Sequence, residues 1–187
     1  MNFMKRKVGA VVIAVVLIVA YCVISTYLSI SDKENLVYTL WGDVERTCFE
    51  KVRAINDIII TTKELPHNDN KLVDLKKQLD ESIKCIIGAS ELTDESFAKF
   101  TNSQEAVNVA LHDYMNGESW YTSPEIKTKR EMINRFDNRL LIEVEAYNNS
   151  AKDFNAYISR IRHKYIAHLG NFKPKFFIES SNDTIVK

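Results

Sequence analysis

The chain has few of the residues that end helices and form turns, with only 5 Gly and 3 Pro among 187 residues. Val, Ile and Thr, which favour strands, do not alternate with polar residues over long stretches. Because a β-rich fold needs both that alternation and frequent turns, the two absences argue against it. The composition predicts an all-α chain whose helices are long.

The chain also has no excess of either charge, since 25 Lys and Arg balance 25 Asp and Glu. Three of the bases, Lys5, Arg6 and Lys7, form a cluster near the N-terminus, and without them the chain carries 22 bases against 25 acids. A nucleic-acid-binding protein would carry a basic stripe on one face. The charge balance therefore argues against nucleic acid as a partner.

Motifs that carry out chemistry are missing as well. The chain contains no Gly-rich phosphate loop, no G-x-S-x-G elbow and no H-E-x-x-H zinc motif. One Glu-x-x-His spacing occurs at Glu64–His67, but carboxylate-bridged metal sites need two copies on regular helices, and Pro66 interrupts this one. His112, His163 and His168 have no companion at zinc spacing. We expect neither an enzyme nor a bound metal or cofactor.

What the chain does contain is a long apolar run, Val8–Ile30, without a charged residue. About 20 such residues suffice to cross the hydrocarbon core of a membrane as one helix. The basic cluster precedes this run, and the positive-inside rule then places the N-terminus in the cytoplasm. The sequence thus predicts a single-pass protein of the cell (inner) membrane, with a cytoplasmic N-terminus at 1–7, an anchor at 8–30, an extracytoplasmic helical bundle at 31–170 and a C-terminal tail at 171–187.

An uncleaved signal-anchor is the favoured interpretation of this run. A cleaved signal peptide has a shorter apolar region of about 7–15 residues, followed by a small-x-small cleavage site. No such site follows here. Lipoprotein processing at Cys22 would need a small residue before the cysteine, where Tyr21 stands instead. We therefore expect the anchor to stay joined to the rest of the chain.

Apolar residues at spacings of three and four follow the anchor and predict four long helices. No Pro or Gly lies between Ile30 and Val37, so the anchor is expected to run on into the first of them. The other three are expected at about 70–88, at 93–117 in one or two pieces, and at 124–170 without a break. The prediction is a transmembrane helix that continues into an elongated antiparallel up-down four-helix bundle. The apolar seam of the first helix comprises Val37, Trp41, Val44, Cys48, Val52, Ile55 and Ile59.

Two cysteines outside the anchor, Cys48 and Cys85, lie at nearly equal distances from the turn expected at Leu65–Asn68. An antiparallel pair of helices joined there would bring them to the same height. Either they form a disulfide, which suits an oxidising compartment, or they are two buried free thiols that behave as small apolar residues. The sequence leaves both alternatives open.

Specific residue patterns appear toward the C-terminus: Asp137–Leu140 reads Asp-Asn-Arg-Leu, Glu145–Asn148 reads Glu-Ala-Tyr-Asn, Phe154 and Asn155 repeat the aromatic-Asn pair, and Gly170–Glu179 is rich in Phe and Lys. This pattern resembles the LemA family of bacterial membrane proteins. The resemblance implies a membrane-anchored helical bundle, and the family has no established catalytic activity or cofactor. The residues that carry the family motif are Asn138, Arg139, Tyr147, Asn148, Phe154 and Asn155.

The chain departs from the family pattern at two places. Residues 53–60 lack the Pro that the family usually shows in its first helix, and Arg162–Tyr165 replaces an expected Phe-Pro pair. A kink that the family has at these places is therefore not expected here.

The aromatic-Asn pairs at 147–148 and 154–155 lie seven residues apart, which is two helical turns. Their Asn residues therefore share one side of the last long helix. One interpretation is a polar ladder that grips a ligand or a partner helix. The other is a core seam in which each Asn bonds a neighbouring helix of the bundle and fixes its register.

The C-terminal region is both basic and aromatic, and an up-down bundle would return it to the membrane. One hypothesis places its aromatic side chains at the bilayer interface and its bases on lipid phosphates, as membrane or partner contacts. The alternative is that Phe176 and Phe177 plug the open base of the bundle. The candidate contact residues are Arg160, Arg162, Lys164, Phe172, Lys173, Lys175, Phe176 and Phe177.

These observations favour a non-enzymatic interaction or scaffold protein of the bacterial envelope. Its expected partners are the lipid bilayer, other membrane or envelope proteins, and further copies of the chain. Trp120 and Tyr121 in the last interhelical loop either meet a partner or cap the end of the bundle. The alternative function is a sensor-like extracytoplasmic bundle that binds a small ligand between its helices and works through a partner membrane protein.

Overall fold

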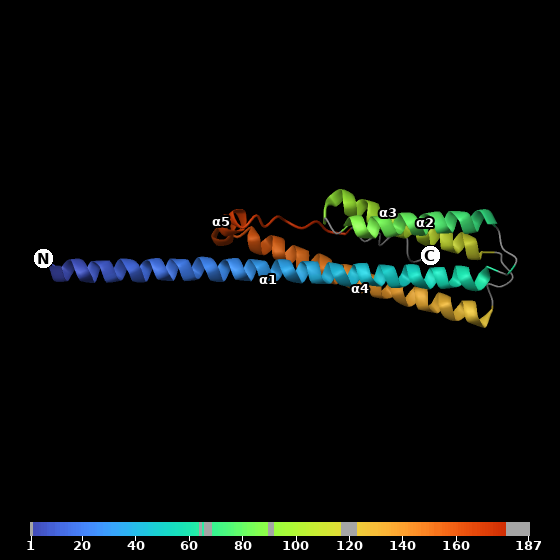
Figure 1. Cartoon of the computed structure of the whole chain (residues 1–187), viewed down its shortest axis with the longest axis horizontal. Helices are drawn as coiled ribbons and strands as arrows, with labels where there is room; N and C mark the ends of the chain where they lie inside the picture. The colour runs from blue at the N-terminus through green and yellow to red at the C-terminus, as the bar shows by residue number, and fades with distance from the viewer. Residues whose placement is uncertain (1, 64, 66–68, 90–91, 117–122, 179–187) are drawn as a thin grey trace.

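The computed structural model describes residues 2–63, 65, 69–89, 92–116 and 123–178, and the regular elements among these residues are all helices (Figure 1). The all-α class predicted from the sequence is confirmed. The elements in chain order are α1 (Asn2–Thr62), α2 (Asp69–Gly88), α3 (Asp94–Met115), α4 (Pro124–Ile158) and α5 (Ile161–Leu169).

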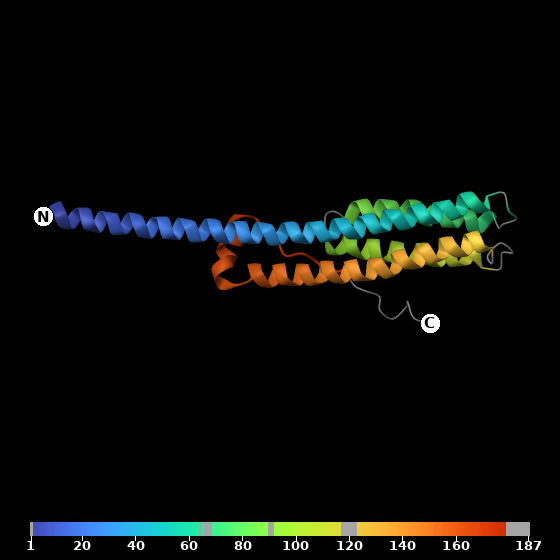
Figure 2. The same cartoon turned by 90° about the horizontal axis from the view of Figure 1, so that it is seen from below.

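The first helix, α1, is a single rod of 61 residues. At a rise of 1.5 Å per residue it is about 90 Å long, and it runs through nearly the whole length of the molecule (Figures 1 and 2). Its N-terminal half includes an 18-residue window that is long and apolar enough to cross a membrane, and no residue of that window is buried. The prediction that the apolar run continues into the first bundle helix without a break is confirmed.

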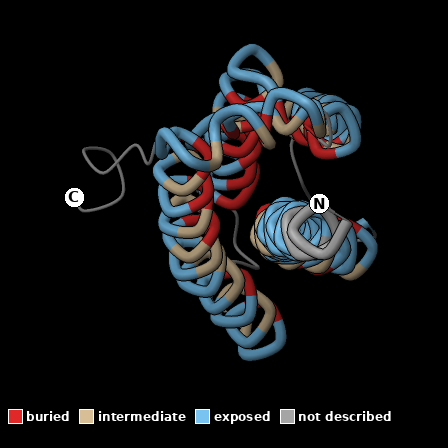
Figure 3. Tube along the Cα trace, turned by 90° about the vertical axis from the view of Figure 1, so that its left-hand side faces the viewer, coloured by how far each residue is buried: buried red, intermediate tan, exposed pale blue. Residues whose placement is uncertain are grey.

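The C-terminal half of α1 packs along α4, while α2 and α3 pack on each other and lie beside that pair (Figures 1 and 2). The buried stretches of these helices face one another (Figure 3). Every residue of the apolar seam predicted for α1 is buried, from Val37 to Ile59. The spacing of three and four therefore located the core-facing side of this helix correctly.

The starts of α3 and α4 follow the local signals in the sequence. The Thr93 hydroxyl accepts a hydrogen bond from the Ser96 backbone N–H, and the Ser96 hydroxyl accepts one in return, which forms a capping box. The Ser123 hydroxyl caps α4 ahead of Pro124. Of the two alternatives for the third helix, the structure has the single piece.

The last helix differs from the prediction, because it is interrupted at Ser159 and Arg160 and does not run unbroken to Gly170. The Ser159 hydroxyl donates to the Ala156 carbonyl at 3.0 Å, and His163 Nδ1 lies 2.9 Å from the Tyr157 carbonyl. Side chains thus take the place of main-chain partners and let the helix end without Pro or Gly. The apolar spacing carries no signal for this break.

A tight turn after α5 reverses the chain. Asn171 adopts a left-handed conformation with φ 56°, and the Phe172 N–H donates to the Ala167 carbonyl at 2.9 Å, which is the pattern of a Schellman motif. A Cβ at position 170 would lie 2.5 Å from Cε2 of the Phe172 ring, so a larger residue there would have to displace that ring. The tail that follows therefore runs back along the bundle (Figure 1).

Candidate functional site

The most elaborate polar arrangement outside the helices holds the extended tail, residues 172–178, by its main chain. On α4, Asn155 Oδ1 accepts from the Lys175 N–H at 2.8 Å, and Asn155 Nδ2 donates to the Lys175 carbonyl at 2.8 Å. Asn148 binds Ile178 in the same way, at 2.9 and 2.8 Å. Each amide side chain serves as a two-bond clamp, of the kind that a neighbouring strand provides in a sheet.

The spacing of the clamps matches the spacing of the main-chain groups that they bind. Seven residues of helix between Asn148 and Asn155 correspond to about 10.5 Å. Three residues of extended chain between Lys175 and Ile178 correspond to about 10 Å. The clamps therefore fix the register of the tail, and they satisfy backbone groups that no helix or sheet pairs.

A third contact to the tail comes from Tyr147, whose hydroxyl donates to the Phe176 carbonyl at 3.0 Å. Tyr147 is fully buried, and burial raises the pKa of its hydroxyl well above the ordinary value. The hydroxyl consequently keeps its proton at neutral pH and remains a donor. The ring also packs edge-on against Trp41 and Phe97, at 5.8 and 5.6 Å between centroids.

The Lys175 side chain fastens the tail to α1. Its Nζ lies 2.5 Å from Glu34 Oε1 and 2.9 Å from the Tyr38 hydroxyl, and the side chain is only 7 % exposed. The sequence predicts Lys175 as a membrane or partner contact, and this is wrong for Lys175, because its charge is buried against Glu34. Neither Glu34 nor Tyr38 is recognisable from the sequence as its partner, since they lie more than 130 positions earlier.

The other candidate contact residues divide into two groups. Phe172 is half-buried and stacks on Tyr27 of α1, with 5.3 Å between ring centroids. Phe176 and Phe177 are 46 % and 47 % exposed, so they do not plug the base of the bundle. Four bases remain exposed to solvent: Arg160, Arg162, Lys164 and Lys173.

The Asp-Asn-Arg segment of α4 fastens that helix to α1. Asp137 Oδ1 lies 2.5 Å from Nζ of Lys51, whose side chain is only 2 % exposed, and Asn108 of α3 accepts a second hydrogen bond from the same ammonium at 2.6 Å. Arg139 pairs with Glu50 of α1 and with Glu143. Asn138 between them is exposed. Lys51 thus joins α1, α3 and α4. This role is not predicted from the sequence, because the apolar spacing of α1 carries no sign of a buried charge.

The aromatic-Asn ladder predicted from the sequence has a different partner from either alternative. Its Asn side chains hold neither a ligand nor a neighbouring helix, but the chain's own tail. Phe154 and Tyr147 are buried, as a core seam requires. The sequence offers only a partial signal for this arrangement, because Pro174 disfavours a helix that continues through the tail and leaves its backbone groups to be paired by side chains.

Cys48 and Cys85 are free thiols in the structure, and Cys48 is buried while Cys85 is partly exposed. Burial raises the pKa of Cys48 to about 12, which is only partly opposed by nearby Lys51. The Cys48 thiolate is therefore scarce at pH 8.

In a Cys22→Ser variant at pH 8, we expect Cys85 to react with a maleimide in the folded protein and Cys48 to react only after unfolding. Mass spectrometry of the two peptides, with and without denaturant, measures this difference. Two modified thiols before unfolding would contradict the buried position of Cys48. No modification until a reductant is added would show a disulfide.

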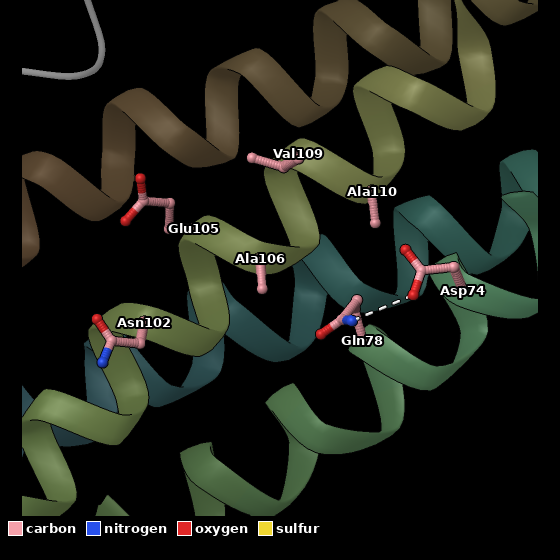
Figure 4. A pocket seen from close by; sticks show the side chains of 7 residues that line it. All are labelled: Asp74, Gln78, Asn102, Glu105, Ala106, Val109 and Ala110. Carbon is pink, nitrogen blue, oxygen red and sulfur yellow. Dashed lines mark hydrogen bonds between the residues drawn. The ribbon is translucent and has the colours of Figure 1, made fainter.

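A shallow hollow lies between α2 and α3, with a volume of about 370 Å³ (Figure 4). Gln78 Nε2 donates to Asp74 Oδ1 at 3.3 Å along its edge. Its remaining lining residues are Asn102, Glu105, Ala106, Val109 and Ala110. Side chains that pair among themselves around small alanines give no convergent set of groups for a ligand.

No group of three or more His, Cys, Asp or Glu side chains that suits a metal ion occurs among the described residues. The Glu64–His67 spacing lies mostly outside those residues, as do Trp120 and Tyr121.

The groups of α1 and α4 that contact the tail are amides and a phenol, which bind its main chain, and a carboxylate, which pairs with the Lys175 side chain. Such groups bind and position a peptide segment and do not form a nucleophile with a base. Comparison of the chain with protein-family models, with curated proteins and with solved structures found no match. The function is therefore argued from the geometry of the molecule.

Proposed function

We propose that this protein is a membrane-anchored, LemA-like interaction or scaffold protein of the bacterial envelope, without enzymatic activity. In this proposal α1 crosses the inner membrane once, with the N-terminus in the cytoplasm and the helical domain outside. The observation that carries the proposal is the continuity of α1, which joins an exposed apolar stretch directly to the buried core seam. A rigid connection of this kind holds a domain at a fixed height and direction above a membrane.

The helical domain itself is proposed to be an antiparallel up-down four-helix bundle. The packing of α1 on α4 and of α2 on α3 supports this arrangement. The buried Lys51 adds to the support, because its ion pair and hydrogen bond join α1, α3 and α4 at one level.

A non-enzymatic role is supported by how the buried polar groups of the described core are used. Lys51 and Lys175 each pair with a carboxylate from another segment, and the two Asn clamps bind main chain. These groups consolidate the fold. Large apolar side chains instead remain exposed on the outer faces of the domain, where a protein partner would cover them, including Val73, Ile87, Val109 and Ile142.

Crosslinking in living cells tests this proposal. A photoreactive amino acid at Ile142 or Val109, which are 68 % and 56 % exposed, is expected to give adducts with envelope proteins or a second copy of the chain. The same group at exposed Lys152, about 80° around α4 from Ile142, serves as the matched control, with fewer adducts expected. Adducts confined to this control level, together with a rise in Tm of the purified chain with a small molecule, would overturn the scaffold proposal and favour the sensor.

A further inference from the structure

The short helix α5 exposes a stripe of large apolar side chains. Ile161, Tyr165 and Leu169 are 83 %, 73 % and 83 % exposed, and they lie four residues apart. Positions i, i+4 and i+8 lie on one side of a helix. Ala167 is the only buried residue of α5. The exposure of the three large apolar side chains to water is therefore unfavourable, and it marks a contact surface.

This helix lies beside α1 at the C-terminal end of the apolar stretch (Figure 1). Phe172, just after α5, stacks on Tyr27, and the position of Gly170 is within 3.0 Å of the same ring, measured from an added Cβ. Tyr27 lies about 20 residues beyond the start of the apolar run at Val8, which corresponds to about 30 Å of helix. That length equals the hydrocarbon thickness of a bilayer, so α5 is at the level where hydrocarbon gives way to headgroups.

The charged residues of α5 and of the chain segments that flank it in sequence are all bases. Residues 154–178 contain no Asp or Glu, although the chain as a whole has no net charge. Lys175 is neutralised by Glu34, while Arg160, Arg162, Lys164 and Lys173 remain exposed. An apolar stripe flanked by exposed bases suits an anionic lipid surface.

We propose that α5 is an interfacial helix, which lies in the membrane surface beside the anchor with Ile161, Tyr165 and Leu169 in the boundary between headgroups and acyl chains. The flanking bases then contact anionic lipid phosphates. The tilt of a membrane helix relative to the bilayer normal is set by its interfacial contacts. A contact of α5 with the membrane surface would therefore fix the tilt of α1. This inference rests on the proposed membrane anchoring. It keeps the bases of the sequence-based hypothesis but takes Ile161, Tyr165 and Leu169 as the apolar contact in place of Phe176 and Phe177, and it leaves out Lys175.

Fluorescence quenching by lipids tests the depth of α5. An environment-sensitive fluorophore is attached to a Leu169→Cys variant of the full chain, with Cys22 and Cys85 replaced by Ser, in vesicles of phosphatidylcholine and phosphatidylglycerol. We expect the emission of this label to be shifted to the blue. We also expect most of its intensity to be quenched when the lipids carry a nitroxide near the top of the acyl chain. The matched control is Ile142→Cys, which is similarly exposed on α4. Position 142 is far from the proposed membrane surface. It is one turn from Arg139, which pairs with Glu50, and Glu50 is about 35 Å along α1 from Tyr27.

Equal, water-like emission from both labels would overturn the proposal. A blue shift of the label at position 169 that grows with protein concentration would also overturn it, because a second copy of the chain would then cover the apolar stripe. Replacing Arg160, Arg162 and Lys164 by Gln should reduce the quenching at low salt and leave the control unchanged. Quenching that does not respond to these substitutions would overturn the role of the bases. Failure of the anchoring itself is distinguishable, since the chain would then be extracted from the vesicles by alkaline carbonate.

Discussion

Replacing Asp137 by Ala should lower the free energy of unfolding by about 2–4 kcal/mol, because it leaves the Lys51 ammonium buried without its anion. The Lys51 side chain is 2 % exposed, so water reaches its ammonium only through the space that the carboxylate leaves. Asp137 is itself 32 % exposed, and solvent weakens its attraction to Lys51. The expected loss of stability is therefore at or below the roughly 3–5 kcal/mol that is typical when a fully buried ion pair loses one partner. Chemical denaturation of the detergent-solubilised chain, followed by the fluorescence of its Trp residues, measures the change.

Two variants make this prediction specific. Asp153→Ala removes an exposed acid from the same helix and should change stability by less than about 0.5 kcal/mol. The double variant Lys51→Met, Asp137→Leu removes both charges and should recover much of the loss, since apolar pairs of similar size replace buried ion pairs well. A double variant as unstable as Asp137→Ala would show that the damage does not come from the unpaired ammonium.

Replacing Asn148 and Asn155 by Ala should release the tail from α4. Four main-chain hydrogen bonds are lost, each worth about 1 kcal/mol, so the amide hydrogens of Lys175 and Ile178 should exchange about 100-fold to 1,000-fold faster. Hydrogen exchange with mass spectrometry of the C-terminal peptide measures this rate. Trypsin should also cleave after Lys175, whose side chain is shielded in the folded protein.

Asn149→Ala is the matched control for the clamps, because this exposed residue is adjacent to Asn148 on the same helix. It should leave both the exchange rates and the trypsin pattern unchanged. Unaltered exchange in the double Asn variant would mean that Tyr147 and Lys175 hold the tail without the clamps. The Asn ladder would then have no role in fixing the register of the tail.

The helices that the sequence predicted correctly are those set by local signals. The caps at Thr93 and Ser123 act on the next turn of the same helix, and the apolar spacing of α1 depends only on the helical period. The break between α4 and α5 was missed although it is also local. Its cause is a set of bonds from Ser159 and His163 to backbone carbonyls, which compete with helical bonds that the same residues also permit.

The candidate site was predicted only in part for a related reason. The aromatic-Asn repeat marks a polar stripe on one helix, yet the repeat does not say what the stripe contacts. The tail that occupies it comes from 20 to 30 residues later and depends on the reversal at Asn171. The assignment of Lys175 as a membrane or partner contact failed for the same reason. Its partner, Glu34, comes close only when the tail packs against α1.

The sequence by itself determined the long apolar stretch, its continuation into a long helix, the all-α class and the buried side of α1, because each depends on residues within a few turns of one another. Only the tertiary structure decided that Lys51 and Lys175 are buried, that the Asn ladder holds the tail, and that α5 presents its apolar stripe beside Tyr27. Those features depend on charges and hydrogen bonds between segments up to 141 positions apart, and such pairings are set by packing and not by any local pattern.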